Sequence, residues 1–112
     1  LKTLYDKSGN KVYLNDYENL ASDSLQVVFP GRIGYEQFYG KIYIGGLDSG
    51  IYDFNIIEIL IYLNDSKISY SELTNCYLTL SNGFLTIIGN HQKRFNDWKM
   101  CIIQATLSIT KR

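Results

Sequence analysis

The sequence has few of the residues on which metal and catalytic sites depend. Its 112 residues include one histidine, two cysteines, one proline, one methionine and one tryptophan. Two cysteines and one histidine fall short of the four ligands of a structural zinc site, so we expect no metal and no cofactor. A Ser-His-Asp or Cys-His catalytic set would have to use His91, and no nucleophile motif lies near it. These shortages predict a protein that is not an enzyme.

The sequence also lacks net charge and long apolar runs. Eleven basic side chains balance eleven acidic ones, whereas general binders of nucleic acids or anionic membranes carry a net positive footprint. The longest apolar stretch, residues 51–63, is interrupted by Asp53, Asn55 and Glu58. No run reaches the ~18 apolar residues of a membrane span, so we expect no membrane-spanning segment. No signal-peptide pattern opens the sequence, and the compartment stays open.

Aromatic residues are abundant instead. Ten tyrosines and five phenylalanines, together with many isoleucines and threonines, favour strands over helices. A length of 112 residues fits a single β domain over residues 1–112. The frequent use of Ile, Asn, Tyr and Lys suggests a bacterial or phage genome rich in A and T.

The clearest local signal is a β-hairpin over residues 76–88, CYLTLSNGFLTII. Asn82-Gly83 at its centre suits a type I′ turn, because both residues tolerate positive φ. Opposed residues share a face of a sheet, so the turn predicts one wholly apolar face, which other elements must cover. That face comprises Cys76, Leu78, Leu80, Leu85 and Ile87. The predicted pairs are Ser81–Phe84, Leu80–Leu85, Thr79–Thr86, Leu78–Ile87 and Tyr77–Ile88.

Further strands are predicted from apolar runs bounded by turn residues. They cover residues 1–5, 11–14, 25–29, 41–44, 51–63 and 100–109. Pro30-Gly31 is expected to stop the third of them, because Pro-Gly is a turn dipeptide. Asn15 or Asp16 could cap a helical turn over residues 17–21, and residues 68–73 are either an edge strand or a helical turn. The expected fold is all-β: an antiparallel β-sandwich or small barrel of about seven to eight strands, with one short helical turn.

Two strands carry further expectations. Residues 51–63 are apolar on both faces, which indicates a strand covered on both sides. A helix is the alternative, but its apolar stripe would omit Ile57 and Ile61. The last strand has an apolar face from Cys101 to Ile109, and we expect it to pair with the second hairpin strand in a three-stranded meander. That order would hold Cys76 and Cys101 ~9–10 Å apart, beyond the ~7 Å limit for a disulfide, so both are expected to be small buried hydrophobes.

The polar segment 89–99 is the first candidate contact site. Its sequence GNHQKRFNDWK contains the only histidine and the only tryptophan. An aromatic ring beside cations can stack a base or a sugar while Lys or Arg holds a phosphate. The alternative is a solvated hairpin loop whose Trp98 or Phe95 packs back onto the sheet. The candidate residues are His91, Lys93, Arg94 and Trp98.

The aromatic and glycine-rich segment 32–43 is the second candidate. Tyr and Trp give contact area at low entropic cost and are frequent in binding surfaces. The alternative is that two of its four rings belong to the core. The candidate residues are Tyr35, Phe38, Tyr39 and Tyr43.

Other motifs carry little chemistry. The glycine-rich loop 45–50 lacks the Gly-Lys-Ser/Thr ending of a phosphate loop. Glu36, Asp53 and Glu58 are acids among apolar residues, and a sugar hydrolase would need two of them to converge. Glu58, within the isoleucine-rich strand, is the first acid to check for a raised pKa.

These observations favour a non-enzymatic β-sheet module for protein–protein interaction, such as an assembly component or an inhibitor or immunity-type protein. Its partner would be another protein or a second copy of the chain. The first alternative is a carbohydrate-binding β-sandwich, which predicts exposed rings near Asp or Asn side chains. The second alternative is weak nucleic-acid binding through the 91–99 loop.

Overall fold

The computed structural model describes residues 4–6, 11–12, 24–43 and 52–111, and the side chains of residues 26–43 and 53–108. All regular elements described are antiparallel strands except one 3-10 turn. The strands are β1 Leu4–Asp6, β2 Lys11–Val12, β3 Ser24–Ile33, β4 Gln37–Tyr43, β5 Tyr52–Tyr62, β6 Lys67–Ser69, β7 Leu73–Ser81, β8 Phe84–His91 and β9 Lys99–Lys111, and the 3-10 turn is η2 Tyr70–Glu72.

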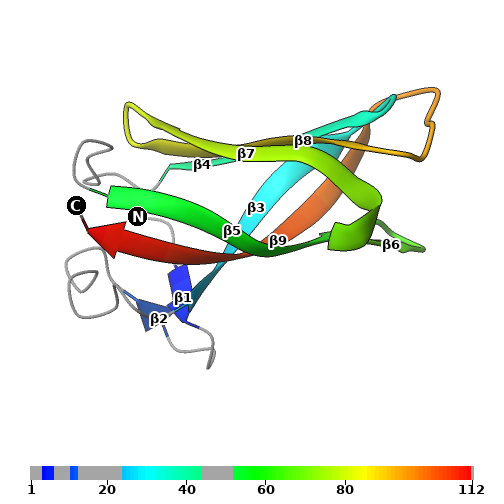
Figure 1. The fold of residues 1–112 in the computed structure, drawn as a ribbon. Coiled ribbons are helices and arrows are strands. Elements are labelled where there is room, and N and C mark those ends of the chain that lie inside the picture. Colours follow the sequence, from blue (N-terminus) through cyan, green and yellow to red (C-terminus); the bar gives the residue numbers. More distant parts are fainter. Residues whose placement is uncertain (1–3, 7–10, 13–23, 44–51, 112) are drawn as a thin grey trace.

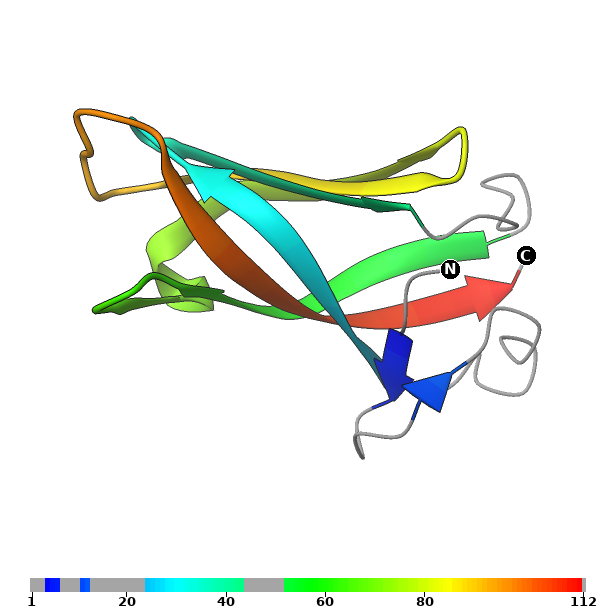
Figure 2. The same ribbon diagram turned by 180° about the vertical axis from the view of Figure 1, so that it is seen from behind.

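Seven strands form one continuous sheet in the order β6-β5-β9-β3-β4-β8-β7, and β1 pairs with β2 and β3 beside this path. The sheet curls into a half-barrel. β4, β8 and β7 form one wall, while β5 and the end of β9 form the other (Figures 1 and 2). The long twisted strands β3 and β9 run from one wall to the other. The predicted all-β antiparallel class is confirmed, and the arrangement observed is one curled sheet around one core.

The predicted hairpin is confirmed in position and register. β7 and β8 pair as expected, from Ser81 opposite Phe84 to Tyr77 opposite Ile88. Asn82 and Gly83 have φ values of 53° and 81°, as a type I′ turn requires. The apolar face points into the half-barrel, where Leu85 and Ile87 are buried and the other three members pack against the core.

The predicted meander is wrong. β8 pairs with β4, and β9 lies between β5 and β3. β4 alternates between exposed and buried residues along its whole length, so it offers β8 the same match of apolar faces that β9 would. The alternation shows that a strand has an apolar face but does not select its neighbour. Both cysteines are free; Cys101 is buried as expected, whereas Cys76 is only half-buried.

The expected end of a strand at Pro30-Gly31 is also wrong, because β3 continues to Ile33. Gly34 N–H donates to the Gln37 carbonyl at 2.8 Å. By the alternation of an antiparallel ladder, residue 30 then faces the β4 side. The β3–β4 ladder ends at Gly31 opposite Gly40, so the missing N–H of Pro30 falls where β4 no longer pairs. Proline is tolerated at such edge positions.

Residues 52–62 form a strand, as predicted, but the strand is not covered on both faces. A β-bulge shifts the β5–β9 register between Ile56 and Glu58. Before the bulge Phe54 and Ile56 pack against the core, and after it Ile59 and Ile61 are buried. The inward face therefore changes from even to odd positions, which explains why both faces look apolar in the sequence.

Residues 67–72 contain both of the predicted alternatives, the edge strand β6 followed by the turn η2. The Ser69 N–H donates to a Glu72 carboxylate oxygen at 2.8 Å, which fixes the start of that turn. β1 and β2 confirm two short N-terminal strands. The predicted helical turn 17–21 and the loop 45–50 lie outside the described residues.

The core lies on the concave face of the sheet. Ile103 is fully buried there, and its δ-methyl group occupies space that Gly31 and Gly40 leave open. A Cβ at Gly31 would lie 2.6 Å from that methyl, and one at Gly40 would lie 3.0 Å from it. The paired glycines thus let β3, β4 and β9 curl tightly around one isoleucine. The fully buried side chains of largest volume are Phe29, Phe38, Ile33, Ile59, Ile61, Ile68, Leu85 and Ile87.

Candidate functional site

The structure joins the two candidate segments into one site at the end of the half-barrel. Segment 34–39 turns from β3 into β4, and residues 90–98 run from the end of β8 towards β9. Backbone and side-chain contacts connect these segments, although they lie more than fifty residues apart in the sequence. Sequence reasoning treated them as separate candidates.

The end of β8 holds the β3–β4 turn in place. His91 N–H donates to the Glu36 carbonyl at 3.1 Å, and the Asn90 amide donates to the same oxygen at 3.0 Å. Glu36 itself has a φ of 61°, in the left-handed region. Such a backbone at a non-glycine residue persists only where its surroundings hold it, and these two hydrogen bonds provide that support.

His91 was expected in a polar loop, but it is the last residue of β8 and only 4% of it is exposed. Its Nε2 lies 2.7 Å from the Gly34 carbonyl, so Nε2 carries the proton and donates. Its ring packs at a tilt against Phe95, 5.6 Å between centroids. Nδ1 is buried and has no hydrogen-bond partner among the described residues. In this position His91 anchors the turn and does not reach the surface.

Arg94 links the β8–β9 loop to the β3–β4 turn through two contacts at the protein surface. Its guanidinium donates to the Tyr35 hydroxyl at 2.8 Å and pairs with the Glu36 carboxylate at 3.0 Å. Both partners of the ion pair are largely exposed, so the pair contributes little stability. The pair does neutralise one of the two cations on which the nucleic-acid hypothesis depends. The other, Lys93, is exposed.

Trp98 covers the backbone of Gly34, where a Cβ would lie 2.6 Å from the indole ring. It also meets Tyr39 edge to face, with ring centroids 5.8 Å apart. Trp98 remains 50% exposed and Tyr39 42% exposed. Part of the ring therefore packs back onto the sheet, as the solvated-loop alternative predicted, and part stays open to a ligand.

The remaining candidates separate from this cluster. Phe38 is buried in the core, which removes it from any surface platform. Tyr43 is exposed at the far end of β4, where its ring meets Phe84 at 5.2 Å. Of the acids considered for sugar hydrolysis, Glu36 lies in the β3–β4 turn and pairs with Arg94, whereas Glu58 is exposed on β5.

A shallow groove of about 340 Å³ lies beside Trp98 and was missed in the sequence. Its lining combines three partly exposed aromatic rings and three amides with the buried ring of Phe38, and none of its side chains is charged. We call it the amide groove; it is lined by Gln37, Phe38, Tyr39, Asn75, Tyr77, Ile88, Gly89, Asn90 and Trp98. Asn75 had no sequence signal, because its position depends on a bulge in β7 between Thr74 and Tyr77.

A second missed feature is an apolar patch on the convex face of β3, β5 and β9. Tyr62 lies opposite Ile102, and Ile102 lies opposite Pro30. Met100 and Val28 are two residues away on the same strands and the same face. Met100 is 79% exposed and Ile102 47% exposed. We call Val28, Pro30, Tyr62, Met100 and Ile102 the outer patch.

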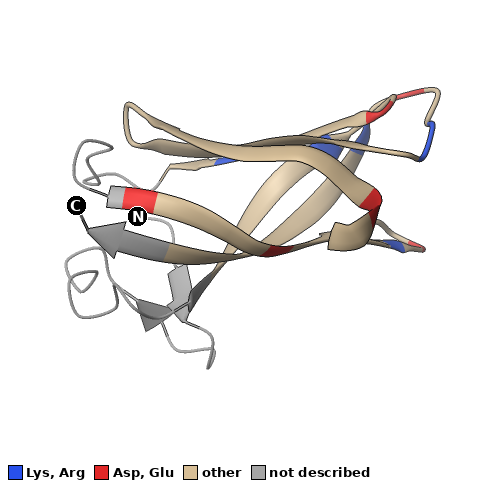
Figure 3. Cartoon of the chain, viewed as in Figure 1, with Lys and Arg blue, Asp and Glu red and all other residues tan. Residues whose placement is uncertain are grey.

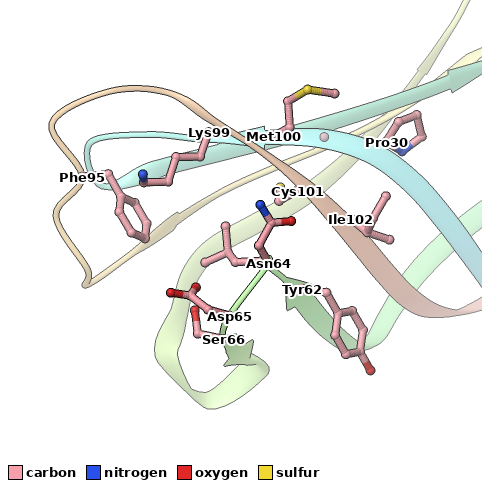
Figure 4. A pocket seen from close by; sticks show the side chains of 12 residues that line it. Pro30, Tyr62, Asn64, Asp65, Ser66, Phe95, Lys99, Met100, Cys101 and Ile102 are labelled. Atoms are coloured by element: carbon pink, nitrogen blue, oxygen red, sulfur yellow. The ribbon is translucent and has the colours of Figure 1, made fainter.

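A larger hollow of about 890 Å³ adjoins the outer patch. It lies between the β5–β6 turn at residues 63–66 and the loop bearing Phe95 (Figure 4). Asp65 and Lys99 are the charged side chains that line it, and the Lys99 ammonium lies over the Phe95 ring, 5.8 Å from its centroid. The opposite charges leave the hollow without a net attraction for one sign of ligand.

Charged side chains form no single-sign face in the part of the chain that the structure describes (Figure 3). Basic and acidic positions are scattered over the visible strands and loops, and both signs occur at the end of the half-barrel that bears the β8–β9 loop. Among the same residues, no group of three or more His, Cys, Asp or Glu side chains gathers as a metal site would require. No helix in the described ranges is long and apolar enough to span a membrane.

Comparison with protein-family models, with curated proteins and with solved structures finds no match for this chain.

Proposed function

We propose that this chain is a non-enzymatic interaction module that contacts another protein surface through the outer patch. The main support for this proposal is that five exposed apolar side chains lie together on three neighbouring strands, β5, β9 and β3. A contiguous exposed apolar patch is a mark of an interaction site. Interface cores are enriched in aromatic residues and Met and depleted in charge, which is the composition of this patch.

The surroundings of the patch support a protein as its partner. The convex face of β9 turns polar on one side of the patch, at Gln104, Thr106 and Ser108, and the exposed Arg32 lies opposite Met100 at the other, so the patch has a polar border. The lining of the adjoining hollow adds the apolar side chains of Leu63 and Phe95, and Figure 4 shows Phe95 on the loop opposite the β5–β6 turn. An exposed apolar area with an adjacent hollow suits a partner that inserts one side chain and covers the rest.

A second copy of the chain is the first partner to test, because every preparation contains it. We expect the mass measured by light scattering to rise with protein concentration, and the double change Met100→Asp and Ile102→Asp to leave a monomer. The matched control is Thr79→Asp, an exposed position on the convex face of β7 outside the patch. This control should associate like the unchanged protein.

If the chain is monomeric at all concentrations, a photo-crosslinking residue at Ile102 tests for another protein in an extract of the source cells. A discrete cross-linked product that the same residue at Thr79 does not give supports the proposal. A monomer without such a product overturns it.

A further inference from the structure

We propose that the amide groove is a separate binding site for a neutral sugar, so that the chain has a glycan-binding activity beyond the proposed protein contact. The inference depends on the chemistry of the groove lining. Three amide side chains, Gln37, Asn75 and Asn90, face three partly exposed rings, Tyr39, Tyr77 and Trp98.

The amides are held in defined orientations. Asn90 uses its Nδ2 to donate to the Glu36 carbonyl at 3.0 Å, which leaves its Oδ1 to accept from Asn75 Nδ2 at 3.2 Å. A carbonyl only accepts, so this relay fixes which end of each amide is oxygen and which is nitrogen. Asn75 makes this one side-chain hydrogen bond among the described residues, so its Oδ1 and its second N–H stay available to a ligand.

The backbone at Asn75 is built to present that side chain. Asn75 has a φ of 55° and lies where the β7–β8 register shifts by one residue. Bulges re-aim side chains, and a positive φ at a non-glycine residue is retained where the structure needs it. The bulge places Asn75 beside Asn90. In a regular antiparallel ladder Asn75 would instead lie opposite the residue that precedes Asn90 in β8.

The rings supply flat apolar contact. Tyr77 is 51% exposed and Trp98 50% exposed, so each presents a face on which the C–H face of a sugar ring can stack. Tyr39 holds the Trp98 ring by its edge-to-face contact. Aromatic faces beside fixed donors and acceptors match a ligand that has both apolar faces and hydroxyl groups.

Other ligand classes fit the lining less well. No Lys, Arg or His lines the groove, and Arg94 nearby is paired with Glu36, so a phosphate would meet no cation within the groove. A purely apolar ligand would cover the amides without hydrogen bonds, which is unfavourable. A neutral sugar satisfies both the amides and the rings, and a volume of about 340 Å³ is at the small end for ligand sites.

The test uses Trp98, the only tryptophan of the chain, as a reporter inside the groove. Neutral hexasaccharides of glucose, mannose, galactose, xylose and N-acetylglucosamine are titrated into the full chain while the tryptophan emission is recorded. We expect a saturable change with at least one of them. If none of the five gives saturation, or if heparin binds and none of them does, the proposal is overturned.

Two substitutions then locate the site. Asn75→Gly keeps the left-handed backbone and removes the amide, so we expect about tenfold weaker binding with unchanged unfolding. Tyr77→Ala should weaken binding further, because it removes a stacking face. The matched control Tyr43→Ala removes an equally exposed ring outside the groove and should bind as the unchanged protein does. Unchanged affinity in Asn75→Gly would contradict the proposal.

The two proposals fail separately. Met100→Asp with Ile102→Asp should abolish the protein contact and leave sugar binding intact, whereas Asn75→Gly should weaken sugar binding about tenfold and leave the protein contact intact. A chain that binds no sugar can therefore still associate through the outer patch.

Discussion

The two faces of β9 carry similar apolar side chains in opposite roles. Ile103 is fully buried on the concave face, whereas its neighbour Ile102 is 47% exposed on the convex face. Ile103 fills the space beside the paired glycines Gly31 and Gly40, whereas Ile102 belongs to the outer patch. The comparison shows that hydrophobicity alone does not assign a residue to the core. The register of the strand does so.

The sharpest test of this difference is a matched pair of truncations. Ile103→Ala should lower the free energy of unfolding by about 2–5 kcal/mol, because it leaves a cavity that the rigid strands cannot close. Ile102→Ala should lower it by less than about 1 kcal/mol, since half of that side chain already contacts water. Urea denaturation of both variants measures the difference, and equal losses would show that the faces are not distinct.

The glycines beneath Ile103 give the next largest effect. A Cβ at Gly40 would lie 2.7 Å from the Phe29 Cβ, so Gly40→Ala should cost about 1–3 kcal/mol through overpacking. Thermal unfolding monitored by circular dichroism would detect it. A Gly40→Ala protein as stable as the parent would mean that β3 and β4 are not as tightly curled as described.

The concave face also makes stability depend on pH, because the Cys101 thiol is buried there. Burial raises the pKa of its thiol from 9.0 to about 11. The unfolded chain loses this proton above pH 9 while the folded chain keeps it, so stability present below pH 9 falls between about pH 9 and 11. Cys101→Val should show a smaller alkaline loss than the parent in urea denaturation at pH 8 and pH 10.5. Equal losses in the two proteins would assign the effect to other groups.

The turn that joins β7 to β8, and so sets which residues share each face of the hairpin, gives a smaller effect. Gly83 has a φ of 81°, a conformation that an alanine adopts only with strain, so Gly83→Ala should cost about 1 kcal/mol. Asn82→Gly, which keeps positive φ accessible, serves as the control and should change the urea midpoint less. The reverse order would argue against the type I′ turn.

The smallest expected effect on stability lies on the convex face. Met100 is 79% exposed, so Met100→Ser should change the free energy of unfolding by no more than about 0.5 kcal/mol. The same change should weaken association through the outer patch. A large loss of stability together with unchanged association would reverse the roles assigned to the two faces.

Local chemistry made some elements predictable. Asn82-Gly83 specifies the turn and hence the pairing of β7 with β8, and alternation along residues 100–108 specifies which side of β9 is buried. Both signals involve residues close in sequence: the turn type fixes which residues of a hairpin pair, and side chains alternate between the two faces of a strand. The aromatic segment and the His91 to Trp98 loop were also identified as candidates, but not that they meet.

The tertiary structure decided the rest. β8 has partners of equal apolar character in β4 and β9, and only closure of the whole sheet selects β4. The bulge at Ile56 and Glu58 and the one before Tyr77 each add a residue that no short-range pattern marks. The contact of His91 with Gly34 spans 57 residues. The amide groove and the outer patch exist because these long-range pairings bring distant residues onto one face. By itself, the sequence determined the Asn82-Gly83 turn and the buried faces of the unbulged strand segments beside it and in β9, because those depend on neighbouring residues. The path of β3 through Pro30, the change of face in β5, the strand order and the sites depend on the packing of all strands together.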